Sequence, residues 1–198
     1  MASTVAWALL ASAPLATEAQ APPPPGVLVE TVEKSYRLDE RSLEAVVDRL
    51  NSTRLEGPNG PPSQGLTTYR IQPEWRATAS GGSCRVSRIT VHVEIEITLP
   101  EWRWAETVSL EDREKWATID RAIREHEYRH RDLTVDAAAD LLDSLQGLEA
   151  RGCTTLRRVV NSQVSVADGR LSEAHAQLDR ETKRVLRLGG SASLQPAG

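Results

Sequence analysis

An alternation of apolar and polar residues over 89–99 constrains the fold more than any other feature of this chain. The odd positions hold Ile, Val or Leu, and the even positions hold Thr, His or Glu. Because successive side chains of a strand point to opposite faces, this segment predicts a strand with one buried and one wetter face. Val86 is out of phase with Ile89, which predicts a β-bulge near Ser87, and we expect Pro100 to end the strand.

The segments before this strand predict more of the same sheet. Residues 27–36 and 66–77 alternate well enough to be strands. Between them, Asp39 can cap a helix that runs through Asn51, and the Gly- and Pro-rich segment 56–65 is expected to be a loop. These elements predict an α+β fold whose small antiparallel sheet needs a cover for its apolar face.

Residues 109–152 predict the long helix that covers the sheet. The Ser109 side chain can cap the first turn, and Asp112 suits the positive end of the helix. Gly152 is expected to end it, and a further helix is expected over 171–188, after an Asp168-Gly169 turn. Ten residues recur at steps of three, four or seven and predict one face turned to the sheet: Trp116, Ile119, Ile123, His126, His130, Leu133, Ala137, Leu141, Leu145 and Leu148.

The sequence His126-Glu127-Tyr128-Arg129-His130 lies within this helix and reads H-E-x-x-H. Residues i and i+4 share a helix face, so the two imidazoles can bind one Zn²⁺ ion. Glu127 can then act as the general base, as in metallopeptidases. The alternative interpretation is a pair of core histidines that hydrogen-bond backbone or carboxylate groups.

A catalytic zinc ion needs a third protein ligand, and the sequence alone leaves several candidates open. Asp179 and His175 are four residues apart on the C-terminal helix and share a face, and Glu173 is close by. His92 lies on the wetter face of the strand. Asp132 or Asp136 could instead orient a metal-bound imidazole by accepting its second N–H.

The N-terminal segment predicts export to the periplasm or the medium. Residues 5–16 are apolar and are followed by small residues, which predicts a signal peptide over 1–21, with a Pro-rich spacer over 22–26. We then expect a single domain over 27–188 and a flexible tail over 189–198. In an oxidising compartment Cys84 and Cys153 can form a disulfide bond.

Composition excludes several classes of protein. The formal net charge of −4 argues against a general nucleic-acid-binding protein. No apolar run reaches the roughly 18 residues that a transmembrane helix needs. With two Cys and four His, the chain cannot be a Cys-rich zinc scaffold. The oligomeric state is left open.

The order of these features resembles domain of unknown function family 922, a bacterial family described as predicted secreted zinc-dependent proteases. The resemblance extends from about Val29 to Thr182 and implies a zincin-like α+β domain with its active-site helix packed on the sheet. The residues that support it are Tyr36, Gly57-Pro58, Trp75, Cys84, Leu99-Pro100-Glu101-Trp102, Trp116, the motif over 126–130, Cys153 and Asn161.

The C-terminal part of the resemblance contains a departure. The family has Tyr-Asp, two variable residues, Thr, one variable residue and then His-Gly. Asp179 and Thr182 match this pattern, but Leu178, Arg184 and Val185 stand where the family has Tyr, His and Gly. If that His is the family's third ligand or a transition-state donor, this chain lacks it, which leaves Asp179 as the better candidate for the third zinc ligand. The departure bears on catalytic power more than on metal binding.

These observations predict a secreted zinc metallopeptidase in which His126, His130 and Asp179 bind zinc and Glu127 is catalytic. Its partner would be a peptide or protein substrate, with no nucleic acid and no membrane span. One alternative is a non-catalytic envelope protein with a structural or degenerate metal site. The other is an interaction module that uses the charged face of the long helix, although such a face is usually just solvated.

Overall fold

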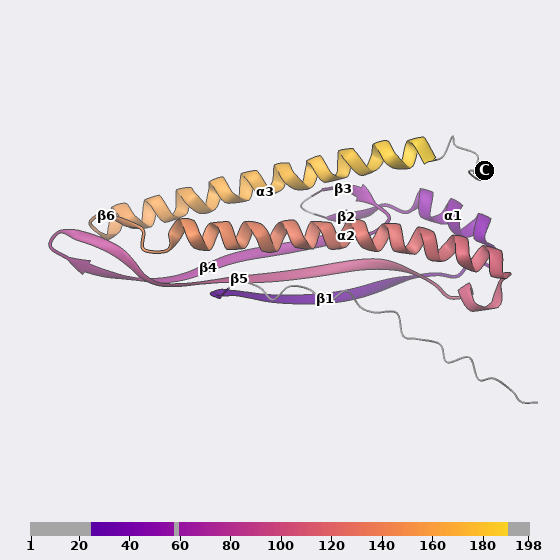
Figure 1. The fold of residues 1–198 in the computed structure, drawn as a ribbon, viewed down its shortest axis with the longest axis horizontal. Helices are drawn as coiled ribbons and strands as arrows, with labels where there is room; N and C mark the ends of the chain where they lie inside the picture. Colours follow the sequence, from indigo (N-terminus) through magenta and orange to yellow (C-terminus); the bar gives the residue numbers. More distant parts are fainter. Residues whose placement is uncertain (1–24, 58–59, 190–198) are drawn as a thin grey trace, which may run out of the picture.

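The computed structural model describes residues 25–57 and 60–189 (Figure 1). The expected signal peptide, most of the expected spacer and nearly all of the expected tail lie outside these residues. The elements in chain order are β1 (Val27–Leu38), α1 (Leu43–Ser52), β2 (Leu55–Gly57), β3 (Gly60–Ser63), β4 (Leu66–Ser80), β5 (Ser83–Trp102), the 3₁₀ turn η1 (Ala105–Thr107), α2 (Leu110–Leu145), β6 (Glu149–Arg151) and α3 (Cys153–Gly189).

The sheet is built around β5, and it is mixed rather than purely antiparallel. β4 and β5 form a long antiparallel hairpin, and β6 pairs antiparallel with the start of β5. β1 pairs with the other edge of β5 in parallel, which corrects the expected antiparallel sheet. The chain between these two strands forms α1, β2, β3 and β4, and this long connection is what a parallel pair requires.

The alternating strand is confirmed and is longer than the sequence predicts. The register shift between Arg76 and Ala77 skips Ser87, which confirms the predicted bulge. Pro100 does not end the strand, because pairing with β1 continues through Tyr36–Pro100 to Leu38–Trp102. The segment expected to be a loop forms the small antiparallel pair β2–β3.

The two long helices lie antiparallel, with α2 between the sheet and α3 over part of its length (Figure 1). Ser109 caps α2 as predicted, and its side chain accepts a hydrogen bond from the Asp112 N–H. The helix ends at Leu145 and not at Gly152, because Gly147 adopts a positive φ of 69° and the chain then forms β6. α3 begins at Cys153 and passes through Asp168-Gly169 without the expected turn.

α2 has two packing partners, which corrects the predicted stripe. Leu133 and Ala137 are only half-buried, whereas Glu127, Thr134, Ala138 and Leu142 are buried. One side of α2 packs on the sheet, where Ala138 and Leu142 join the valines and isoleucines of β5. Another side faces α3, and the histidine motif lies at this second contact.

Three further features fix the ends of the domain. Ser42, and not Asp39, caps α1 by accepting a hydrogen bond from the Ala45 N–H. The predicted disulfide between Cys84 and Cys153 is present and ties the start of β5 to the start of α3. Among the described helices, none combines the length and apolar character needed to cross a bilayer.

Candidate metal centre

Three potential metal ligands converge between the two long helices. His126 and His130 lie on α2, and Asp179 lies on α3. The two Nε2 atoms are 3.1 Å apart, and Asp179 Oδ1 lies 3.2 Å from Nε2 of His126 and 3.0 Å from Nε2 of His130. Three donors bound to one tetrahedral zinc ion, each about 2.0–2.1 Å away, would lie about 3.3 Å from one another. The triangle of ligand atoms therefore fits a metal ion of this size.

The geometry follows from helix periodicity on both helices. His126 and His130 are one turn apart on α2, and the two successive turns of α3 that face them contain His175, Asp179 and Thr182. The sequence pattern predicts that the two histidines face the sheet, but in the structure their ligand atoms face α3. Asp179, the favoured third ligand, is the carboxylate that reaches them.

His130 is held in place by a buried hydrogen-bonded chain. Its Nδ1 lies 2.7 Å from Nδ1 of His175, a residue that is only 3% exposed. Nε2 of His175 lies 3.4 Å from the hydroxyl of Thr134, which donates to the carbonyl of His130 one turn earlier. The Tyr69 ring stacks on His175 at 4.9 Å. Burial and the neighbouring charge of His130 lower the pKa of His175 to about 4, so its imidazole is neutral at neutral pH.

His126 has its own hydrogen-bonding partner on α3. The hydroxyl of Thr182 lies 3.0 Å from His126 Nδ1 and donates to the carbonyl of Leu178. The oxygen keeps lone pairs that can accept the N–H of His126. Each histidine of the pair thus has a partner at Nδ1, which leaves Nε2 available as a metal ligand.

Asp179 supplies the negative charge of the group. Burial alone would raise its pKa, but hydrogen bonds and charge from His126 and His130 lower the pKa well below its usual range. Asp179 is therefore a carboxylate at neutral pH. Two imidazole nitrogens and one carboxylate oxygen form the mixed nitrogen and oxygen ligand set that zinc binds in proteins.

Glu127 lies next to this group on the sheet side of α2. Its side chain is 2% exposed, and Oε2 accepts a hydrogen bond of 2.8 Å from the Thr67 hydroxyl at the start of β4. Burial raises the pKa of the Glu127 carboxyl, although Thr67 and the two motif histidines oppose the shift. A buried carboxylate of raised pKa is a stronger base than an exposed one.

Gly65 allows the chain before β4 to approach Glu127 closely. A Cβ atom at this position would lie 2.7 Å from Oε1 of Glu127 and 2.9 Å from the Ile123 side chain. These distances are too short for any residue larger than glycine without displacing its neighbours. Gly65 and Thr67 together fix the position of the Glu127 carboxylate.

The other candidates from the sequence do not join the ligand group. Glu173 is exposed, and His92 lies on the open face of the sheet beside Glu74. His175 contacts the far nitrogen of His130 rather than the ligand triangle. Asp132 and Asp136 are exposed, so His175 and Thr182 make the contacts to the imidazole Nδ1 atoms that these carboxylates were expected to make.

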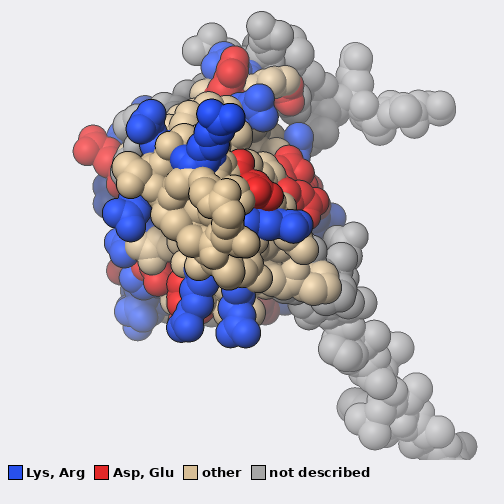
Figure 2. Space-filling model, turned by 90° about the vertical axis from the view of Figure 1, so that its left-hand side faces the viewer, with Lys and Arg blue, Asp and Glu red and all other residues tan. Residues whose placement is uncertain are grey.

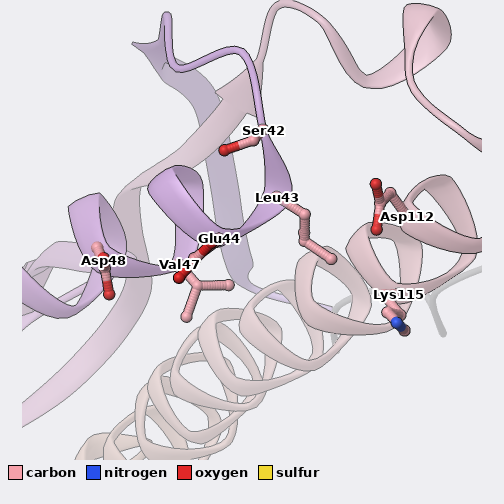
Figure 3. Close-up of a pocket in the computed structure, with 7 residues that line it drawn as sticks. All are labelled: Ser42, Leu43, Glu44, Val47, Asp48, Asp112 and Lys115. Atoms are coloured by element: carbon pink, nitrogen blue, oxygen red, sulfur yellow. The ribbon is translucent and has the colours of Figure 1, made fainter.

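A hollow of about 490 Å³ lies elsewhere, between α1 and the first turns of α2 (Figure 3). Figure 3 shows Glu44 and Asp48 from α1 and Asp112 and Lys115 from α2 around it. Its lining residues are far along α2 from the motif and belong to a different part of the molecule.

Sequence reasoning missed the groups that orient the motif. Thr182 could have been recognised as a site residue, since it matches the family pattern close to Asp179. Thr134 lies one turn after His130 and could have been suggested by helix periodicity. Gly65, Thr67 and Tyr69 come from a strand that is distant in sequence, and nothing local to the motif points to them.

Comparison with protein families identifies the family to which the chain belongs. The sequence profile of a family described as bacterial protein of unknown function (DUF922) matches residues 33–186, which is most of the chain. The chain belongs to this family. The matched range of this DUF922 protein includes the three convergent ligands, Glu127, the disulfide and the paired long helices. Neither the curated proteins nor the solved structures contained a match.

Proposed function

We propose that this protein is a zinc-dependent metallopeptidase in which His126, His130 and Asp179 bind the metal and Glu127 is the general base. The observation that supports it most is the triangle of three ligand atoms 3.0–3.2 Å apart, with a buried glutamate at the adjacent position of the same helix. Peptide hydrolysis is the chemistry that the H-E-x-x-H arrangement on a helix serves.

The number of ligands favours a catalytic over a structural site. Within the described residues, three side chains of suitable type lie within 4.8 Å of one another, and structural zinc sites usually have four. His175 does not complete a set of four, because it contacts the Nδ1 side of His130. The side chains of His126 and Asp179 are each 14% exposed, so the group is reachable from solvent.

When bound, a zinc ion at these ligands supplies Lewis-acid polarisation of the carbonyl and lowers the pKa of water. Glu127 accepts the proton of the water that attacks the peptide carbonyl, and it returns this proton to the leaving amine nitrogen. The Thr67 hydroxyl holds the Glu127 carboxylate in place by donating a hydrogen bond to Oε2. Thr182 and His175 keep the two imidazoles in the orientation that binds metal.

The test separates metal binding from turnover. Purified protein is loaded with zinc, its metal content is measured, and cleavage of an unfolded protein such as casein is followed. We expect one zinc ion per chain and cleavage that a chelator abolishes. Glu127→Gln should keep the zinc and lower the rate by about 10²–10⁴-fold.

Two outcomes would contradict the proposal. Equal cleavage by Glu127→Gln would remove this residue from the mechanism. Stoichiometric zinc without cleavage of any peptide library would favour the non-catalytic metal-binding protein, in line with the residues at Arg184 and Val185 that depart from the family pattern.

We infer in addition that the protein is exported. The Cys84–Cys153 disulfide supports this, since such bonds persist mainly in oxidising compartments. The N-terminal sequence of protein recovered from the medium or the periplasm tests it, and recovery of uncleaved protein in the cytoplasm would contradict it.

A further inference from the structure

The end of the molecule formed by the β4–β5 turn, β6 and the start of α3 is strongly basic. Residues 76–88 and 149–158 contain six arginines, no lysine and a single acidic residue, Glu149, although the whole chain has a net charge of −4. Figure 2 views the molecule from this end and shows basic side chains around much of its rim, with acidic groups at the top, at the left and to the right of the centre. All six arginines are exposed: Arg76, Arg85, Arg88, Arg151, Arg157 and Arg158. We call this region the arginine end.

The arginines of this end lack the carboxylate partners that several other arginines have. Within the described part of the chain, none of the six takes part in an ion pair, and Arg85 donates to the Gly147 carbonyl. Elsewhere Arg70 and Arg124 each pair with a carboxylate. Charges that are left uncompensated on one end are available to an external anion.

Two structural details increase the positive potential here. Arg76 and Arg88 lie directly opposite each other in the β4–β5 register, an arrangement of like charges that destabilises a sheet. The first turn of α3 contains no acidic residue, whereas those of α1 and α2 do. The positive end of the α3 dipole is therefore not neutralised. An anionic surface that approaches this end reduces the repulsion between Arg76 and Arg88 and neutralises the positive end of the α3 dipole.

The arginine end is also rigid. The disulfide joins Cys84 to Cys153, and β6 pairs with the start of β5, with Ser83 opposite Arg151. The strand hairpin and the helix start therefore hold the backbone positions of these arginines in a fixed arrangement. The backbone then needs no ordering on binding, and the entropy cost is confined to the side chains.

We propose that the arginine end docks the protein on a bilayer that contains anionic phospholipids. The guanidinium group forms paired hydrogen bonds with phosphate oxygens. Because basic side chains surround this end of the molecule (Figure 2), a planar array of phosphates can contact several of them together. The end contains no aromatic residue, so it has no side chain to stack on nucleic-acid bases.

Docking would set the orientation of the whole molecule. The remainder of the chain is acidic and is repelled by the same surface, so the long axis stands away from the bilayer. The α-helical rise from His130 to Leu145 places the metal centre about 22 Å back from the end of α2. This inference does not depend on the proposed peptidase activity.

Vesicle sedimentation of the full chain tests the proposal. We expect binding to vesicles of equal phosphatidylglycerol and phosphatidylcholine, little binding to pure phosphatidylcholine, and at least a tenfold loss of binding at about 0.5 M salt. A variant neutralises two strand and two helix positions: Arg76→Gln, Arg88→Gln, Arg157→Gln and Arg158→Gln. It should bind at least tenfold more weakly while it melts no lower than the unchanged protein.

The matched control removes the same charge from exposed arginines elsewhere: Arg37→Gln, Arg54→Gln, Arg121→Gln and Arg170→Gln. It should keep the affinity for anionic vesicles within about twofold. Equal losses in both variants, or equal binding to neutral vesicles, would overturn the proposal. Tighter binding to duplex DNA than to anionic vesicles at matched phosphate concentration would also overturn it in favour of a nucleic-acid partner.

Discussion

The two faces of the β5 sheet use the same residue types for different purposes. On the open face, His92 lies 3.5 Å from Glu74, and these side chains are 44% and 72% exposed. On the side that α2 covers, Glu127 is buried against the sheet and His130 is buried between α2 and α3, and both have specific partners. The residue types do not separate the two histidine–acid groups, but their burial does.

Burial changes what such a group can do. Water and salt screen the open-face pairs, including Arg70 with Glu94, and each is worth little. Between α2 and α3, a polar atom that lacks water needs a protein partner, and the hydrogen-bonded chain through His130, His175 and Thr134 provides such partners. A polar group of this kind is positioned accurately, which is what metal binding and proton transfer require.

The largest expected effect comes from removing the covalent link between the start of α3 and the start of β5. The double variant Cys84→Ala and Cys153→Ala removes a disulfide across a sequence separation of 69 residues. On the chain-entropy account, the free energy of unfolding should fall by about 4 kcal/mol. Urea unfolding followed by circular dichroism measures it.

The reducing agent dithiothreitol provides the control for this variant. It should lower the urea midpoint of the unchanged protein to about that of the double variant, and it should leave the double variant unaffected. A midpoint that is the same in all four measurements would show that packing of α3 alone holds the covered face together.

Removing a ligand should have the next largest effect. His130→Ala takes one of the three donors from the candidate metal centre and also removes the partner at Nδ1 of His175. We expect zinc affinity to fall by more than the 10–100-fold that partners of ligands typically contribute. Competition with a fluorescent zinc chelator measures it, and His92→Ala on the open face is the control. Unchanged affinity would show that zinc binds elsewhere.

His175→Ala should have an intermediate effect. It keeps all three ligands but removes the partner at Nδ1 of His130, so zinc affinity should fall by about 10–100-fold. The readout that separates positioning from folding is the ratio of affinity loss to stability loss. Tyr69→Leu is the comparison, since it removes the ring that stacks on His175 but keeps the imidazole. Equal zinc affinities for both variants would contradict a positioning role for His175.

How far the sequence predicts this molecule depends on whether a feature is local. The strand over 89–99, its bulge, the cap at Ser109 and the Cys84–Cys153 disulfide are confirmed. The first three rest on side-chain alternation or helix capping, and each is decided within a few residues. The disulfide was the single pairing open to two cysteines.

The errors concern relations between distant segments. The sequence does not show that β1 runs parallel to β5, because a strand pattern does not specify direction. It does not show that α2 faces a second helix, so Leu133 and Ala137 were placed in the core in place of Thr134 and Ala138. Asp168-Gly169 reads as a turn, but packing on α2 keeps α3 continuous.

The candidate metal centre combines local and distant features. His126, Glu127 and His130 form a local motif. Helix spacing on the C-terminal helix leaves several candidates for the third ligand, and the family resemblance favours Asp179 among them. The structure brings Asp179, rather than Glu173 or His92, to within 3.2 Å of both histidines. Only tertiary packing could reveal Thr67 and Gly65, which position Glu127 from β4.

The smallest expected effect belongs to the open face, and it sharpens the comparison most directly. A double-mutant cycle with His92→Ala and Glu74→Gln isolates the coupling of that exposed pair. Because solvent screens both groups, each variant should change the free energy of unfolding by about 0.5 kcal/mol or less, with a coupling near zero. Zinc affinity should not change. A coupling above about 1 kcal/mol, outside the usual range for exposed pairs, would show that something shields this face from water.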